Sequence, residues 1–127
     1  MADVVVTVPK GLWESWIAEG DAAGSPPSGG AWGFYIGGPR PDVRPGDRVY
    51  VVAHGKLRGY APLTRLEQTA SGWCLVRRGD AVAVTIDRPM PGFRGIRYRD
   101  WSRDEERPFP AWRTEGVPSP TPARRAR

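Results

Sequence analysis

The sequence predicts a mainly β fold with one short helix, in which about six strands close into a small barrel. Glycine and proline contribute 16 and 14 of the 127 residues, and this composition favours short strands joined by turns. Several short segments alternate apolar and polar residues with period two, the pattern of half-buried strands. Closure into a barrel is expected because it removes exposed strand edges. The length is that of one domain.

A β-hairpin is predicted for the central residues 45–63. The turn chemistry lies in Pro45-Gly46-Asp47, because Pro fixes φ and Gly permits positive φ. The following residues alternate between two faces, as the residues of a strand do. One face carries Val49, Val51 and Ala53, and the other carries Arg48, Tyr50 and Val52. The chain reverses at His54-Gly55-Lys56, which is short and contains Gly.

The elements before the hairpin are read from apolar patterns. Residues 4–8 are apolar throughout, which predicts a strand buried on both faces. A short helix is predicted for residues 11–20, because Leu12 and Trp16 are four residues apart, as are Trp13 and Ile17. Residues 21–31, rich in Gly, Pro, Ser and Ala, predict a mobile loop. The aromatic, β-prone residues 32–36 predict the next strand.

Three further strands are expected after the reversal. Residues 57–69 continue the hairpin, and residues 73–77 and 81–86 follow short Gly-containing turns. The run Pro89-Met90-Pro91-Gly92 then breaks the pattern. The last residues, 114–127, are rich in Pro and Arg and predict a flexible tail.

The positive charge is concentrated in the last third of the chain. Residues 1–87 hold nine basic and nine acidic residues, whereas residues 88–127 hold ten Arg and five acidic residues. A local basic surface is suited to a polyanionic partner. Two other readings stay open: a solvated basic tail, and a surface network of arginines with Asp100 and residues 104–106.

Within this basic region, arginines interleave with aromatic residues. Guanidinium groups bind phosphate bidentately, and aromatic rings stack on bases, so the segment 93–103 is the best nucleic-acid signal in the chain. The aromatic members are Phe93, Tyr98 and Trp101. The predicted phosphate-binding residues are Arg94, Arg97, Arg99 and Arg103.

The hairpin sequence PGDRVYVVAHGKLRGYAPLTRL, residues 45–66, resembles the central hairpin of the PUA-like superfamily, which includes the ASCH and EVE domains. The resemblance implies that residues 1–113 form a PUA-like barrel domain. It also implies a ligand cleft bordered by residues 32–36 and by the end of the first hairpin strand. In EVE domains this cleft holds a nucleobase.

We therefore expect a module that binds RNA, DNA or a nucleotide, with an unstacked or modified base as a candidate ligand. Aromatic rings supply stacking surfaces, and Gly59 allows a ligand to approach the strand closely. The predicted ligand-binding residues are Trp32, Tyr35, His54 and Tyr60.

Catalysis on the same fold is the main alternative to simple binding. Some ASCH-type proteins resemble amidohydrolases with a "GKxxT" pattern after the first helix. Here residues 20–24 are Gly-Asp-Ala-Ala-Gly, so the lysine and the threonine of that pattern are absent, which argues against this activity. A ribonuclease or a nucleoside hydrolase could use His54 or Lys10 as its acid–base group. A protein-interaction module using the Pro-rich C-terminus is a third reading.

Metal and cofactor chemistry is not predicted. The chain has one Cys, Cys74, and one His, so it lacks multi-Cys and multi-His metal patterns, and it has no phosphate-loop motif. No apolar run approaches the roughly 20 residues that span a bilayer, and no secretory signal is visible at the N-terminus. A cytoplasmic protein without a membrane partner is expected.

Overall fold

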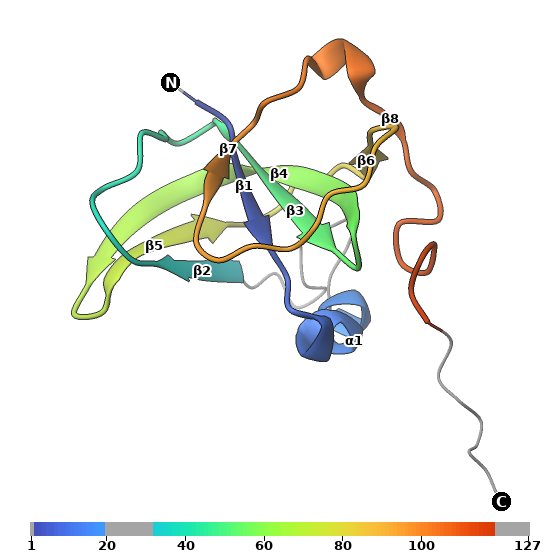
Figure 1. Ribbon diagram of the computed structural model, residues 1–127. Coiled ribbons are helices and arrows are strands. Elements are labelled where there is room, and N and C mark those ends of the chain that lie inside the picture. The colour runs from blue at the N-terminus through green and yellow to red at the C-terminus, as the bar shows by residue number, and fades with distance from the viewer. Residues whose placement is uncertain (1, 20–31, 119–127) are drawn as a thin grey trace, which may run out of the picture.

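The computed structural model describes residues 2–19 and 32–118, and these residues form a mainly β fold with one helix, as predicted (Figure 1). A short 3₁₀ turn at Arg103–Glu105 precedes the last strand. In chain order the elements are β1 (Val4–Thr7), α1 (Lys10–Glu19), β2 (Trp32–Ile36), β3 (Arg48–Ala53), β4 (Lys56–Thr69), β5 (Gly72–Arg77), β6 (Val84–Thr85), β7 (Arg97–Tyr98) and β8 (Arg107–Pro108).

The main sheet has six strands in the order β2-β5-β4-β3-β1-β7, and it is open. β1 runs parallel to β3, and the other neighbouring strands are antiparallel. The predicted closed barrel is therefore wrong for the described residues, in which β2 and β7 are the two sheet edges. β7 pairs with β1 over only two residues and is not paired with β2. A separate pair, β6 and β8, lies beside the main sheet.

The predicted central hairpin is confirmed. His54 and Gly55 form its turn between the paired residues Ala53 and Lys56, with φ values of 49° and 74°. Positive φ at both positions is the conformation of a two-residue turn that matches strand twist. β4 has 14 residues and begins one residue before the predicted segment 57–69. Its first part pairs with β3 and its second part with β5, so it joins the two halves of the sheet (Figure 1).

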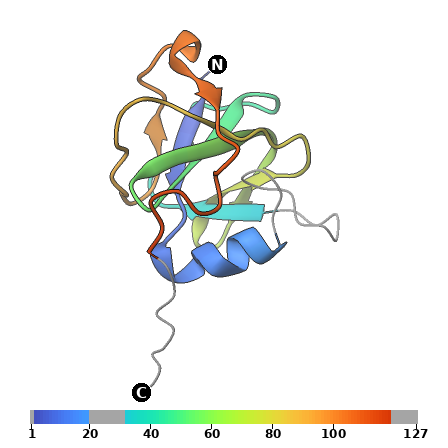
Figure 2. The ribbon, with the colours of Figure 1, turned by 90° about the vertical axis from the view of Figure 1, so that its right-hand side faces the viewer.

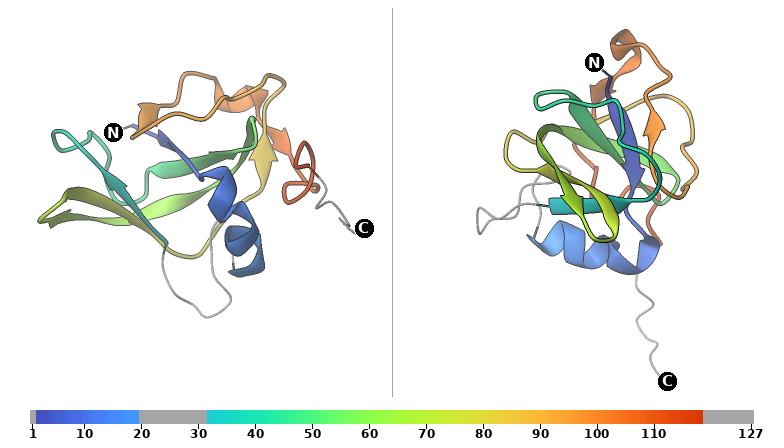
Figure 3. Two further views of the ribbon diagram at one scale, coloured as in Figure 1. Left: turned by 60° about the horizontal axis from the view of Figure 1, so that its bottom comes forward. Right: turned by 90° about the vertical axis from the view of Figure 1, so that its left-hand side faces the viewer.

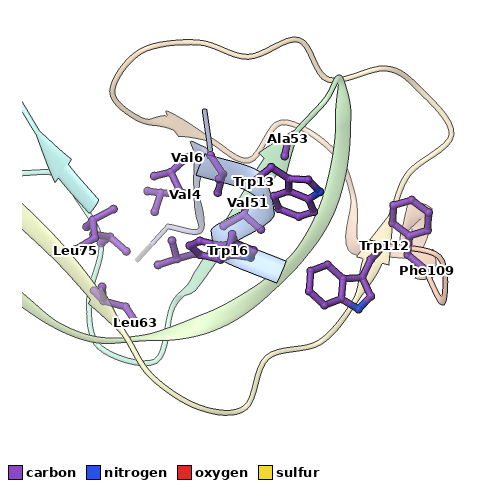
Figure 4. Close-up of a cluster of buried hydrophobic side chains, with 13 residues drawn as sticks. Val4, Val6, Trp13, Trp16, Val51, Ala53, Leu63, Leu75, Phe109 and Trp112 are labelled. Atoms are coloured by element: carbon purple, nitrogen blue, oxygen red, sulfur yellow. The ribbon is translucent and has the colours of Figure 1, made fainter. Parts of the chain in front are cut away.

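Two apolar clusters lie on opposite faces of β1 and β3. The first face carries α1, whose Trp13 and Trp16 are buried against the sheet (Figures 2 and 4). The second face carries Trp101 and the partly buried Phe93 and Met90. Alternation divides the strand residues: Val4, Val6, Val49 and Val51 belong to the first cluster, and Val5, Tyr50 and Val52 to the second. β1 is thus buried on both faces, as predicted.

Elsewhere the boundaries differ from prediction. The strand expected over residues 81–86 is reduced to β6, and Val82 makes an isolated bridge to Tyr60. The predicted loop over residues 21–31 lies outside the described residues. The first residues of the predicted tail, 114–116, lie in a turn that contacts the hairpin, because the Arg58 guanidinium donates to the Glu115 carbonyl at 2.7 Å. Residues 119–127 of that tail also lie outside the described part.

Candidate nucleic-acid interface

Three adjoining hollows meet at Arg88 on the second face of the sheet, and together we call them the Arg88 groove. The first, of about 190 Å³, is lined by Phe93, Arg97 and Trp101 among others. The second, of about 430 Å³, runs past His54. The third, of about 380 Å³, lies toward the 3₁₀ turn. Met90 also lines the groove. The charged residues that line it are Lys56, Arg88, Arg97 and Arg107, together with Asp87, Asp100, Asp104, Glu105 and Glu106.

The loop that forms the centre of the groove is held at two points by hydrogen bonds that its backbone N–H groups donate. The Met90 N–H donates to the Gly55 carbonyl at 2.8 Å, which joins the loop to the hairpin turn. The Phe93 N–H donates to the Thr7 hydroxyl at 3.1 Å, which joins it to the end of β1. Residues 88–92 therefore have a defined position despite their lack of regular structure.

The four predicted phosphate-binding arginines divide into two pairs. Arg94 and Arg97 are exposed and have no acidic partner in the described part of the chain. The Arg97 guanidinium lies 4.4 Å from the centre of the Phe93 ring. Arg99 and Arg103 instead donate to one carboxylate oxygen of Asp3, at 3.1 and 2.8 Å. Arg97 therefore presents an unpaired guanidinium group to the groove, Arg94 is exposed without lining it, and Arg99 and Arg103 hold the N-terminus.

Asp3 is a buried anchor for this region. Burial alone would raise the pKa of its carboxyl, but hydrogen bonds from the Arg48 backbone N–H, Arg103 and Arg99 outweigh that effect and lower the pKa below its ordinary value. The arginine network considered from the sequence thus forms in part with Asp3, a residue distant in sequence. Of the nearby acids, Asp100 pairs with Arg88.

A second buried network supports the floor of the groove at Trp101. The Tyr50 hydroxyl and the Trp101 indole N–H both donate to one oxygen of Glu106, at 2.5 and 2.9 Å. Arg48 bonds the other oxygen at 3.1 Å. Burial and the carboxylate of Glu106 raise the pKa of Tyr50, so its hydroxyl stays protonated. Since each member is hydrogen-bonded, we interpret this network as structural.

The four predicted ligand-binding residues do not form one cleft. Trp32 stacks on Trp16 of α1, with ring centres 4.1 Å apart. Tyr35 is 70% exposed on β2, at the sheet edge opposite to β7. Tyr60 packs against the Tyr50 ring at 5.2 Å, beneath the Arg48 guanidinium. Of the four, only His54 lines the Arg88 groove.

The two candidate acid–base residues lie near each other at the hairpin end. Burial lowers the pKa of His54, and the positive charges of Arg58 and Lys10 lower it further. The imidazole is therefore neutral at pH 7 and can accept a proton. Lys10 is the first residue of α1 and is exposed.

Metal ligands do not gather in the described residues: no group of three or more His, Cys, Asp or Glu side chains is arranged to hold an ion. In the same residues, no helix combines the length and apolar character that a bilayer span requires. Comparison with protein-family models, curated proteins and solved structures gives no match for this chain.

Sequence reasoning missed Arg88, which lines all three hollows. A signal for it was present, because Arg88 directly precedes the Pro89-Met90-Pro91 run. Prolines fix φ on both sides of Met90, which limits the conformations of that loop. A basic residue next to a loop with few accessible conformations is a better binding candidate than one in a flexible segment, because less conformational entropy is lost on binding.

Proposed function

We propose that this protein binds single-stranded nucleic acid in the Arg88 groove. Phosphates contact Arg88, Arg94 and Arg97, and one base stacks on Phe93. The observation that carries the proposal is the Arg97 guanidinium, which lies over the Phe93 ring and has no carboxylate partner among the described residues. A charged planar group on an aromatic ring, at the rim of a hollow, is suited to a phosphate followed by an unstacked base.

The ion pairs in the groove are weak enough for a phosphate to replace the carboxylate partner of each arginine. Arg88 pairs with Asp100, and Arg107 pairs with Asp87 at 2.7 Å. Both acidic side chains are open to solvent, with exposures of 71% and 78%. Exposed pairs of this kind contribute about 0–1 kcal/mol, so a phosphate can replace the carboxylate at little cost. A guanidinium–phosphate pair is then bidentate and charge-assisted.

The hollow beside Phe93 limits the ligand to one small group. Its volume of about 190 Å³ is below that of pockets for drug-sized ligands, roughly 300–1,000 Å³. Its wall combines apolar side chains with Arg97, which suits an aromatic ring that carries polar edges. The proposal therefore includes one base in the hollow and the rest of the strand along the groove. The resemblance to PUA-like domains remains our hypothesis for the family.

The test is a titration of fluorescently labelled single-stranded RNA, single-stranded DNA and duplexes at several salt concentrations. We expect single strands to bind at low salt, with an affinity that decreases as salt increases. Arg97→Ala should weaken binding and reduce the salt dependence by about 0.7 in log–log slope, the value for one lost phosphate contact on a single strand. Phe93→Leu should weaken binding without changing that slope.

Arg78→Ala is the matched control, because Arg78 is exposed and does not line the groove. It removes the same charge from the protein. The proposal is wrong if no oligonucleotide binds at low salt, or if Arg78→Ala and Arg97→Ala reduce binding equally. Equal losses would show that net charge, and not the groove, attracts the strand.

A ribonuclease is the second candidate function, favoured by His54, whose neutral imidazole lies at one end of the groove. A general base must reach the proton that it removes, and an RNA strand in the groove would bring 2′-hydroxyls to that end. Incubation of labelled RNA with the wild type and with His54→Ala tests this function. Cleavage that is lost in His54→Ala supports the ribonuclease function, and intact RNA after long incubation with the wild type contradicts it.

A further inference from the structure

A group of unpaired hydrogen-bond donors is buried on the other face of the sheet, where α1 lies against β2 (Figure 3). Arg77, at the end of β5, is 0% exposed, and its three guanidinium nitrogens have no hydrogen-bond partner. The indole nitrogens of Trp16 and Trp32 are also buried without a partner. We call these three residues the Arg77 corner. They hold all but one of the buried unpaired side-chain polar atoms among the described residues.

The three side chains are close together. Trp32 is directly opposite Arg77 in the pairing of β2 with β5, so both side chains are on the same face. The Arg77 guanidinium lies 5.7 Å from the centre of the Trp16 ring, and this ring is stacked on Trp32. Each unpaired atom is a donor, and none is an acceptor.

The corner has a positive charge that the described residues do not compensate. Burial lowers the pKa of Arg77 to about 9, which still leaves the guanidinium charged at pH 7. Among the described side chains, which do not include that of Glu19, no acidic group pairs with it. Contact with the Trp16 ring is weaker than the cost of taking a charge out of water. Buried charges are normally paired, so a missing negative group is the simplest explanation.

An apolar cavity of about 350 Å³ adjoins the corner: both indoles line it, whereas the buried Arg77 guanidinium lies next to the Trp16 ring without lining the cavity. The cavity lies between α1 and β2, and its other walls are mainly apolar. They are contributed by Thr7, Val8, Pro9, Leu12, Ser15, Gly33 and Phe34. Its size is within the range of small-molecule pockets.

We propose that the Arg77 corner binds the carboxylate of a small organic acid whose apolar part occupies this cavity. The planar guanidinium fork matches the two carboxylate oxygens, and the indole N–H groups supply additional donors. A monoanion suits the apolar surroundings better than a phosphate dianion, because desolvation is less costly for the smaller charge. This site is on the face opposite to the Arg88 groove, so its failure would leave the nucleic-acid proposal unchanged.

The test is thermal unfolding of the full chain with sodium benzoate, indole-3-acetate or acetate, and with the neutral amide benzamide. We expect the two aromatic acids to raise the Tm by roughly 10 °C at a hundredfold excess over their Kd. Acetate should act more weakly, because it leaves the cavity empty, and benzamide should have little effect. Tryptophan fluorescence should change in parallel, since two indoles form the site.

Arg77→Met should abolish the shift, whereas Arg78→Met, at the adjacent exposed position, should retain it. If Arg77→Met does not fold, Arg77→Lys keeps the charge without the fork and should reduce the shift. The proposal is overturned if no carboxylate raises the Tm of the wild type, or if Arg77→Met responds as the wild type does. An equal response to benzoate and benzamide would also overturn it.

A carboxylate from the chain itself is the competing source of negative charge. Glu19 and Asp21 are the next acidic residues after Trp16 in the sequence. Glu19→Gln and Asp21→Asn should leave both the Tm and the benzoate response unchanged. A substitution at either position that lowers the Tm and makes the protein more responsive to benzoate would show that the chain fills the site, and would overturn the proposal.

Discussion

Among the described residues two arginines are wholly buried, Arg58 at the hairpin end and Arg77 in the Arg77 corner, and their surroundings are opposite. Arg58 donates to the carbonyls of Ala53, Trp112 and Glu115 at 2.9, 3.2 and 2.7 Å. Arg77 has no hydrogen-bond partner. Both side chains are 0% exposed. The comparison separates a charge that holds the fold together from a charge whose role the fold does not explain.

The partners of Arg58 show what it contributes. It connects the hairpin to residues 109–118, a segment whose Phe109 and Trp112 complete the first apolar cluster (Figure 4). Its guanidinium also lies 5.5 Å from the Trp13 ring and 5.6 Å from the Phe109 ring. One side chain therefore joins α1, β4 and the C-terminal segment. Arg77 makes no such connection, although it is equally costly to bury.

Substitution of Arg58 should have the largest effect on stability. Arg58→Met leaves three carbonyls without a donor and detaches residues 109–118, so we expect the free energy of unfolding to decrease by about 3–5 kcal/mol. Urea unfolding monitored by tryptophan fluorescence measures the change, with Arg78→Met as an exposed control of the same chemistry. A loss of less than about 1 kcal/mol would contradict the structural role of Arg58.

Substitution of Arg77 should act in the opposite direction. Without added ligand, Arg77→Met replaces an unpaired buried charge by an apolar side chain, and we expect a gain of about 1–4 kcal/mol. The same urea experiment measures it. A large loss, similar to that of Arg58→Met, would remove the difference between the two arginines and would imply a partner within the chain.

The parts of the fold that could be predicted depend on local signals. Turn residues and alternation define the central hairpin, and an unbroken apolar run defines β1. Local signals place Arg77 only in part. Alternation from the buried Leu75 puts it on the inner face of β5, but a charged residue there looks like the end of a strand, and nothing local indicates that it is fully buried.

The parts that could not be predicted depend on contacts between distant residues. Asp3 binds Arg99 and Arg103, nearly the full length of the domain away. Barrel closure would need a pairing between the edge strands β2 and β7, which are distant in sequence, and that pairing is absent from the described residues. The predicted cleft failed to assemble for the same reason: Trp32 packs beneath α1, while Tyr60 packs on the opposite face. Alternation assigns faces within one strand, but it does not relate the faces of separate strands.

Asp3 is a third buried charge that can be compared with Arg58 and Arg77, and like Arg58 it has hydrogen-bond partners within the chain. Asp3→Asn should lower the free energy of unfolding by about 2 kcal/mol at pH 7, the typical contribution of hydrogen bonds to a charged group. The pKa of Asp3 is lowered in the folded state, so its contribution is present above the unfolded pKa, near 3.8, and is lost as pH falls through the folded pKa. Urea unfolding at pH 7 and pH 3 should show a smaller difference from the wild type at pH 3. A difference that is independent of pH would contradict this account.

The smallest expected effect of substituting these arginines is a change in the pKa of His54. This pKa depends on the charge of Arg58 but not on that of Arg77. Burial lowers the pKa of this imidazole first, and Arg58 and Lys10 then lower it further. Arg58→Met and Lys10→Met should therefore each raise it toward 6.5, whereas Arg77→Met should leave it unchanged. Because His54 is the only histidine in the chain, an NMR titration follows it without ambiguity, and Lys10→Met provides the test if Arg58→Met does not fold. If Arg77→Met changes the pKa of His54 as much as Lys10→Met does, both buried arginines act on the hairpin end, and this distinction between Arg58 and Arg77 is wrong.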